Sequence, residues 1–245
     1  MTTAPILSAA AAAAGLLAVI AGPLAAQTGL LSPYTAFRTF ALGTFLGSLL
    51  GVGLGLWALF RSWNQPEAVG RQWAWAGLLV GAALLLTMAL AGASAAKVPP
   101  IHDVTTSPDD PPAFRHALDA EDNRGRDLSY PHGVPDTPER QREAYPDLQP
   151  VPLALAPDAA FSTVRGTAES LGWEILASDA AAGHLEATET SRLFRFVDDI
   201  VIRVRPDEAG TGSVVDLRST SRKGVSDLGA NAERLRRFRD ALVDG

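Results

Sequence analysis

His102 and Asp103 are adjacent and form the pair of side chains best suited to acid–base chemistry. A carboxylate that orients an imidazole makes the histidine a general base or a metal ligand. The remaining histidines, His116, His132 and His184, stand at no spacing typical of a metal site. His102 and Asp103 are therefore weak catalytic candidates, no catalytic residue is assigned, and no metal or cofactor is predicted.

Several enzyme classes lack their motifs in this sequence. It contains no GxSxG nucleophile elbow, no phosphate-binding glycine loop and no dinucleotide fingerprint. It also has no cysteine, which excludes a thiol nucleophile, thiolate zinc sites and disulfides.

Asp198 and Asp199 suggest a carboxylate dyad, but neighbours on a strand point to opposite faces and cannot share a proton. Asp198 shares its face with apolar residues, so we expect it either to be buried beside an arginine or to lie at a β-bulge. The opposite face carries alternating charges, which predict a solvated ladder of cross-strand pairs. The members of this ladder are Arg195, Asp199, Arg203 and Arg205, with Asp216 and Arg218 as partners.

A loop before the last predicted helix is the best candidate for binding an anion. It contains Ser221, Arg222, Lys223 and Ser226, and hydroxyls and basic side chains at a helix N-terminus suit a negative ligand. Asp227 favours the alternative, a structural turn, because a capping carboxylate uses the free amides and repels anions.

The elements that must position these residues lie in the C-terminal half, residues 97–245. Periodicity predicts a helix that begins near Pro157 and stops at Gly172, and then a meander of four antiparallel strands. A last helix follows, with Asp227 as its N-cap. The strands are predicted at 173–178, 184–190, 194–205 and 213–221, and the last helix at 228–243.

Residues 97–157 are rich in proline, which excludes regular helix over most of their length. Apolar residues such as Ile101, Phe114 and Leu148 recur through the segment, whereas a flexible linker would lack them. We expect this segment to run extended over the soluble α+β domain.

The N-terminal part, residues 1–96, is predicted to form three transmembrane helices. Uncharged apolar stretches cover about 4–26, 39–60 and 74–96, and each is long enough to cross a bilayer. The first stretch has an alternative interpretation as a cleaved signal peptide, although no basic residue precedes it. No ionisable residue lies inside a span, which argues against a transporter.

Glycine recurs at every fourth residue of the second span and twice in the third. Such small-residue ridges let another helix approach closely. They predict packing within one three-helix bundle, or contact with a homo-oligomer or a partner membrane protein. The residues are Gly43, Gly47, Gly51, Gly55, Gly77 and Gly81.

Charge is divided unequally along the chain, which has 21 Lys and Arg and 27 Asp and Glu. Most acidic residues follow Lys97, and an acidic soluble domain does not suit nucleic acid. Arg61 and Arg71 flank the second loop and favour its placement in the cytoplasm. The C-terminal domain would then lie outside the cytoplasmic membrane, in the periplasm if the source is a Gram-negative bacterium, and membrane lipids would surround the three helices.

Five sequence blocks follow one another in the C-terminal half: IHDVTT at 101–106, DDPPAF at 109–114, AYPD at 144–147, FVDDIVIR at 196–203 and RSTSRKGVSDLGANA at 218–232. In this order they resemble the domain-of-unknown-function family numbered 1499, in its membrane-anchored bacterial type. The similarity extends over about residues 98–242, and residues 22–30 are similar to the first loop of such members. The resemblance implies membership of the bacterial envelope, with the three spans in the inner membrane, and an ordered proline-rich segment, and it supplies no catalytic residue.

Two functions remain open from the sequence. The first is a non-enzymatic binding, scaffold or assembly protein of the envelope, which the glycine ridges and the missing catalytic motifs favour. The alternative is an unrecognised hydrolase or transferase that acts on an anionic substrate with His102, Asp103 and Arg222.

Overall fold

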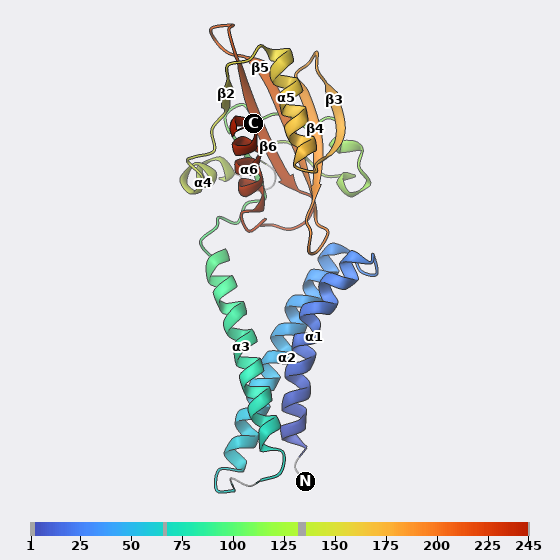
Figure 1. Cartoon of the computed structure of the whole chain (residues 1–245), viewed down its shortest axis with the longest axis vertical. Coiled ribbons are helices and arrows are strands. Elements are labelled where there is room, and N and C mark those ends of the chain that lie inside the picture. The colour runs from blue at the N-terminus through green and yellow to red at the C-terminus, as the bar shows by residue number, and fades with distance from the viewer. Residues whose placement is uncertain (1–2, 66–67, 132–135, 245) are drawn as a thin grey trace. The chain divides into compact units, whose positions relative to one another are not determined.

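The computed structural model describes residues 3–65, 68–131 and 136–244. The chain divides into two compact units, which Figure 1 shows with their elements labelled. One unit comprises Met1–Ala96 with Arg192–Arg195, and the other comprises Lys97–Ser191 and Phe196–Gly245.

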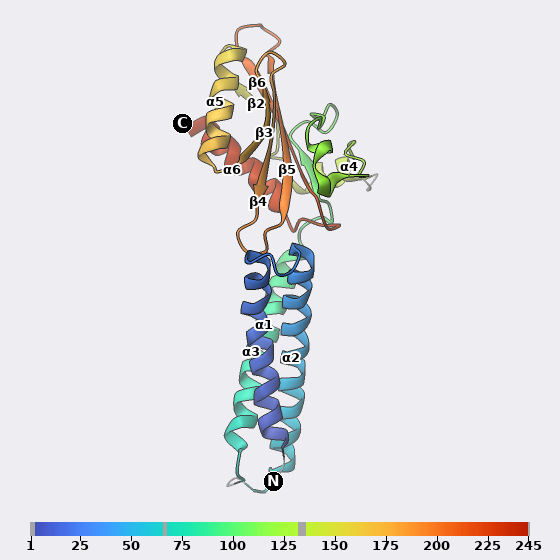
Figure 2. The same ribbon diagram turned by 90° about the vertical axis from the view of Figure 1, so that its right-hand side faces the viewer.

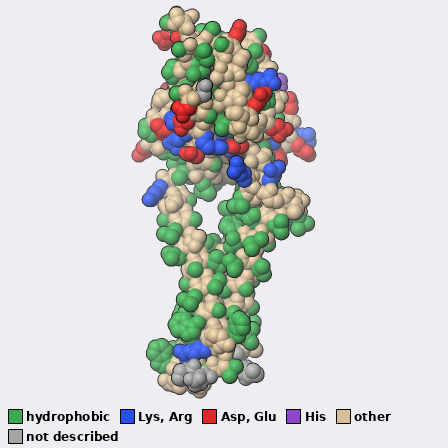
Figure 3. All heavy atoms as spheres, viewed as in Figure 1, with side chains coloured by type: hydrophobic (Ala, Val, Ile, Leu, Met, Phe, Trp, Pro, Cys, Tyr) green, Lys and Arg blue, Asp and Glu red, His purple; other side chains and the backbone are tan. Residues whose placement is uncertain are grey.

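Three helices form the N-terminal unit: α1 (Ala4–Gln27), α2 (Pro33–Arg61) and α3 (Arg71–Ala95). Each contains an 18-residue stretch of high mean hydropathy, with values of 2.1, 1.7 and 2.1, so each is long and apolar enough to cross a membrane. Hydrophobic side chains cover the outside of these helices, whereas charged side chains gather on the second unit (Figure 3). Helices that are apolar on all sides are typical of membrane spans, and this confirms the predicted membrane association.

The six ridge glycines lie between the helices of this bundle. A Cβ added to Gly47 would lie 2.5 Å from the backbone nitrogen of Gly15 in α1. One added to Gly55 would lie 2.9 Å from the carbonyl oxygen of Ala74 in α3. Gly43 and Gly51 similarly face α1, Gly81 faces α2, and Gly77 meets α1. Close backbone approach inside one chain therefore accounts for the spacing of these glycines.

An antiparallel sheet with strands of different lengths forms the centre of the second unit. Its strand order is β1-β6-β5-β4-β3, and β2 also pairs with β6. The sheet has six strands, so the prediction of four was too low. The two missed strands, β1 (Asp103–Thr105) and β2 (Val151–Leu153), pair with opposite ends of β6. The other four are β3 (Glu174–Asp179), β4 (His184–Thr190), β5 (Val197–Pro206) and β6 (Ser213–Ser221).

Helices α5 (Pro157–Ser170) and α6 (Ala230–Asp244) cover one face of this sheet (Figure 2). The main hydrophobic core lies between them and the strands, and includes Ile200, Leu217 and Phe238, which are all fully buried. Trp173 stacks on Phe238 with ring centroids 5.0 Å apart. The α+β class predicted from the sequence is therefore confirmed.

The opposite face of the sheet is covered by the proline-rich segment (Figure 2). Its described residues include the 3-10 turns η1 (Ala117–Asp119) and η2 (Glu121–Asn123) and the short helix α4 (Thr137–Ala144). Phe114, Ala117 and Leu128 pack with Val201 of β5 in a second hydrophobic cluster. Asp199, Asp216 and Arg218 are consequently buried, and the predicted solvated ladder is wrong for these three residues. Arg203 and Arg205 of the same face stay partly exposed.

Local backbone conformation accounts for two differences at element ends. Strand β5 begins later than predicted because Arg195 has a φ of 61°, outside the extended region. Helix α6 begins at Ala230 because Leu228 and Gly229 both have positive φ angles. The predicted N-cap position of Asp227 is therefore wrong by two residues, since Gly229 directly precedes the helix. The Asp227 carboxylate still accepts hydrogen bonds from the N–H groups of Gly229 (2.8 Å) and Asn231 (3.0 Å), so it satisfies a free N–H of the first turn.

Candidate functional site

A layer of buried charges separates the sheet from the proline-rich segment. The residues are Glu186 of β4, Asp199 of β5, and Asp216 and Arg218 of β6, and all are at most 1% exposed. Alternation places them on the face opposite α5 and α6. Charges that leave water are costly unless they are paired, so their partners decide whether any is available for chemistry.

Arg218 forms a bidentate ion pair with Asp103, at 2.9 Å from Nε to Oδ1 and 2.7 Å from Nη2 to Oδ2. It also donates to the carbonyl oxygens of Pro112 and Leu128. Its guanidinium lies 4.9 Å from the Phe114 ring centroid, within the range of a cation–π contact. One buried arginine thus fastens two separate parts of the proline-rich segment to the sheet.

The Glu186 carboxylate is held by backbone N–H groups at the start of η1. Burial raises the pKa of Glu186, but hydrogen bonds from His184 and the backbone outweigh this effect and lower the pKa below its ordinary value. The carboxylate is therefore charged and serves as an anchor for the segment. Its donors are Arg115 N (2.6 Å), His116 N (3.0 Å) and Ala117 N (2.6 Å), with His184 Nε2 at 2.7 Å.

Asp199 pairs with Arg222, at 2.7 Å from Nη2 to Oδ1, and accepts a hydrogen bond from Asn123 Nδ2 at 2.7 Å. Its face neighbour Asp216 pairs with Arg203 and Arg205, as the sequence predicted. On the helix-covered face, Asp198 pairs with Arg234 of α6, and this confirms the expected arginine partner. Both members of the apparent carboxylate dyad are therefore bound separately, on opposite sides of the sheet.

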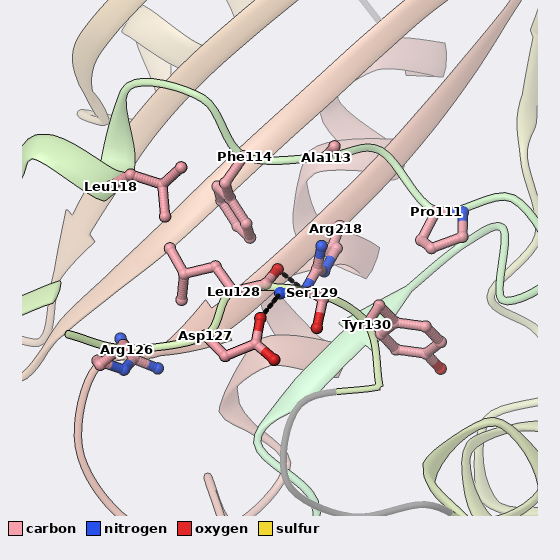
Figure 4. Close-up of a pocket in the computed structure, with 10 residues that line it drawn as sticks. All are labelled: Pro111, Ala113, Phe114, Leu118, Arg126, Asp127, Leu128, Ser129, Tyr130 and Arg218. Carbon is pink, nitrogen blue, oxygen red and sulfur yellow. Dashed lines mark hydrogen bonds between the residues drawn. The ribbon is translucent and has the colours of Figure 1, made fainter.

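A pocket of about 400 Å³ opens between two runs of the proline-rich segment. Figure 4 shows residues 111–118 on one side and 126–130 on the other, with Arg218 between them. Most of the lining is apolar, and the polar members are two arginines, Asp127 and Ser129. The lining residues are Pro111, Ala113, Phe114, Leu118, Arg126, Asp127, Leu128, Ser129, Tyr130 and Arg218.

Of the two arginines in this pocket, Arg218 is paired with Asp103, whereas Arg126 has no carboxylate within ion-pair distance among the described residues. It donates to two neutral acceptors, Oδ1 of Asn123 and the carbonyl oxygen of Ser221 at 2.9 Å. Burial lowers the pKa of Arg126, and the nearby charge of Asp199 opposes that effect. This half-buried cation lies beside apolar walls, an arrangement that suits an anion with an apolar body.

His102 and Asp103, the catalytic candidates from the sequence, contact different partners in the structure. Both carboxylate oxygens of Asp103 are occupied by Arg218, so this residue anchors the sheet. His102 is buried next to β1, and its carbonyl oxygen accepts from Ser221 N at 2.9 Å. His132 lies outside the described residues. Among the described residues, no group of three or more His, Asp or Glu could hold a metal ion.

The four anion-binding candidates have separate partners inside the domain. Arg222 is paired with Asp199, and Ser221 Oγ accepts from Asn231 Nδ2 at 3.0 Å. Ser226 Oγ accepts from the N–H of Leu228 at 3.3 Å. Lys223 is half-exposed, and its Nζ lies 3.9 Å from a carboxylate oxygen of Asp122.

Sequence reasoning missed the pocket because it depends on contacts between distant parts of the chain. The sequence signal for packing of this segment is the recurrence of apolar residues, such as Phe114, within a proline-rich run. Neither Arg126 nor Ser129 belongs to a recognisable motif, and Arg126 meets Ser221 across a long separation in sequence.

Three apolar helices followed by this sheet, with helices on one face and an ordered irregular segment on the other, define a membrane-anchored α+β protein. The chain belongs to the family described as protein of unknown function (DUF1499), whose model matches residues 103–242. The match includes most of the proline-rich segment, α5, all six strands and α6 as far as Leu242. A search of curated proteins finds no match.

Proposed function

We propose that this chain is a non-enzymatic binding protein of the bacterial inner membrane, and that its periplasmic domain binds a small, partly apolar anion. The observation that carries the proposal is the pocket between residues 111–118 and 126–130. Its volume of about 400 Å³ falls in the range of small-molecule sites. Arg61 and Arg71, which flank the loop between α2 and α3, support a cytoplasmic loop and hence a periplasmic domain.

The lining of the pocket supports the proposed ligand class. Phe114, Leu128 and Tyr130 offer aromatic and aliphatic surface to an apolar body. Arg126 can bind a carboxylate, sulfonate or phosphate without losing an existing ion pair, because its described partners are neutral. The hydroxyl of Ser129, which is exposed in the lining, adds a second donor.

A binding role is favoured over catalysis by the state of the nearby carboxylates. Asp103, Glu186 and Asp199 each accept hydrogen bonds from buried donors and hold the fold. Asp127, the carboxylate in the lining of the pocket, accepts a hydrogen bond from the N–H of Ser129 at 2.8 Å. A general base needs a free lone pair within reach of its substrate, and these hydrogen bonds engage all four carboxylates. The assembly alternative, through a homo-oligomer or a partner membrane protein, can act together with ligand binding in the soluble domain.

Native ligands can be identified from the full-length protein. After purification from native membranes in mild detergent, mass spectrometry of everything retained should reveal a small amphipathic anion in stoichiometric amount. The variant Ala113→Trp should lack it, because the new indole fills the rim of the pocket from an exposed position.

The ligand class can be tested with 2-naphthoate and its neutral analogue 2-naphthamide, by calorimetric titration of the full-length protein in detergent. We expect Arg126→Met to weaken naphthoate binding about tenfold or more, as for loss of a charged hydrogen bond, and to leave naphthamide binding unchanged. Arg124→Met removes an exposed neighbouring charge and is the matched control. Equal naphthoate binding by the wild type, Arg126→Met and Ala113→Trp would contradict the proposal.

A further inference from the structure

An apolar groove lies between the end of α2 and the start of α3, within the membrane unit. Its volume is about 400 Å³, and its walls come from large aliphatic and aromatic side chains. Phe60 and Trp63 are 77% and 75% exposed. Such exposure suits side chains that face lipid. The groove is lined by Leu56, Leu59, Phe60, Trp63, Arg71, Trp75 and Leu78.

The charge at this groove is positive. Arg71 donates to the carbonyl oxygen of Ser62 at 2.7 Å, which holds its guanidinium beside the last turn of α2. Among the described residues, no carboxylate lies within ion-pair distance of Arg71. Arg61 is close in sequence, and its guanidinium lies 5.6 Å from the Trp57 ring centroid. Tryptophans and arginines at helix ends mark the headgroup level of a bilayer, where lipid phosphates lie.

The shape of the groove favours a lipid chain over another helix. Helices associate in membranes through small residues that allow close backbone approach. On α2 and α3 those residues, Gly51, Gly55 and Gly77, are buried against the bundle's own helices. The groove instead presents bulky side chains around a hollow, which a flexible acyl chain can fill and a helix cannot.

We propose that this groove is a binding site for an anionic phospholipid. One acyl chain packs against Leu59, Phe60 and Leu78, and the headgroup phosphate is bound by Arg71 at the mouth of the groove. The indoles of Trp63 and Trp75 border the glycerol region. This site is separate from the soluble-domain pocket, so either can exist without the other.

Native mass spectrometry of the full-length protein in mild detergent tests the site. The protein is titrated with phosphatidylglycerol and with phosphatidylcholine that carry identical palmitoyl and oleoyl chains. One phosphatidylglycerol should bind at least about fivefold more tightly, which corresponds to about 1 kcal/mol for one basic residue near a lipid surface. Arg71→Gln should abolish this preference, Arg71→Lys should keep part of it, and Leu78→Trp should block both lipids by filling the groove.

Arg38→Gln is the matched control, since it removes one positive charge from the opposite end of α2, where Arg38 stacks on Tyr34. It should leave the lipid preference unchanged. Equal binding of the two lipids to the wild-type protein overturns the proposal, and this comparison needs no variant. A dimer that forms through the groove and excludes lipid overturns it as well, because a second copy would then be the occupant.

Discussion

Asp103 and Arg218 show why charged residues occur at the centre of this fold. Each is almost fully buried, so desolvation opposes the pair, and an apolar pair of equal volume would not carry that cost. The arginine has a second task, because it donates to carbonyl oxygens in two parts of a segment that lacks regular backbone pairing. The pair therefore satisfies irregular backbone that an apolar side chain would leave without donors.

Removal of one member of the Asp103–Arg218 pair should destabilise the soluble domain. We expect Asp103→Asn to lower the free energy of unfolding by about 3 kcal/mol or more, because Arg218 remains buried without a counter-charge. Thermal unfolding of the full-length protein can be followed by the β-sheet infrared band, to which the membrane helices do not contribute. Arg165→Met is the control, since its pair with Glu169 is half-exposed and should matter by less than about 1 kcal/mol. Equal losses for both variants would refute the proposed anchoring role of Asp103.

Among the elements, α1 and α2 depend most on the absence of side chains. At Gly47 even a methyl group meets backbone atoms of α1, and backbone cannot move aside as a flexible side chain can. The neighbouring Gly53, on the same helix, has open space around its missing Cβ. Alanine substitutions at the two positions therefore distinguish the steric effect of a methyl group at a helix contact from the effect of alanine on helix propensity.

Gly47→Ala should separate α1 from α2 and reduce the folded, monodisperse fraction of the protein after mild heating in detergent. Size-exclusion chromatography measures this fraction. Gly53→Ala should be neutral, or more stable by up to about 1 kcal/mol because alanine favours helix. Unchanged heat resistance of Gly47→Ala would show that the ridge tolerates a methyl group and that the bundle packs differently.

Regular elements could be predicted from the sequence because their periodicity is local. Uncharged runs predicted the three membrane helices, and alternation predicted β3 to β6 within a few residues of their ends. β1 and β2 were missed because each has only three residues, and Pro152 interrupts the pattern of β2. Proline is tolerated there because β2 lies at the edge of the sheet.

The candidate site could be predicted much less well, for a physical reason. Arg203 and Asp216 were correctly paired across neighbouring strands, since register links residues that alternation places on one face. The burial of that face depends on the proline-rich segment, whose path is fixed by single hydrogen bonds between distant residues. Such contacts leave no period in the sequence, so neither the covered face nor the Arg126 pocket could be predicted.

For the molecule as a whole, the proline-rich segment is part of the folded domain. Thr106 N–H donates to the carbonyl oxygen of Leu217 at 2.8 Å, and Ala117 N–H donates to Glu186 at 2.6 Å. Both acceptors lie in central strands of the sheet. The segment and the sheet should therefore unfold together as one cooperative unit.

Hydrogen–deuterium exchange of the full-length protein tests this cooperativity. Peptides that cover residues 103–117 should exchange almost as slowly as β6, because their N–H groups open only when the domain unfolds. The turn between β5 and β6, whose residues 208–211 are exposed, provides the fast reference. Exchange of 103–117 at the rate of this turn would identify the segment as a separately opening cover.

During evolution, substitutions should accumulate differently on the two faces of the sheet. On the face covered by α5 and α6, apolar residues such as Ile200 and Leu217 can drift one at a time, since cores accept changes that conserve volume. On the other face, a change at Asp103 or Arg218 alone leaves a buried charge without its partner. A protein with only one of the two substitutions is therefore selected against. Lineages of this family should therefore alter positions 103 and 218 together or keep both, and ancestral sequences should contain few half-changed pairs.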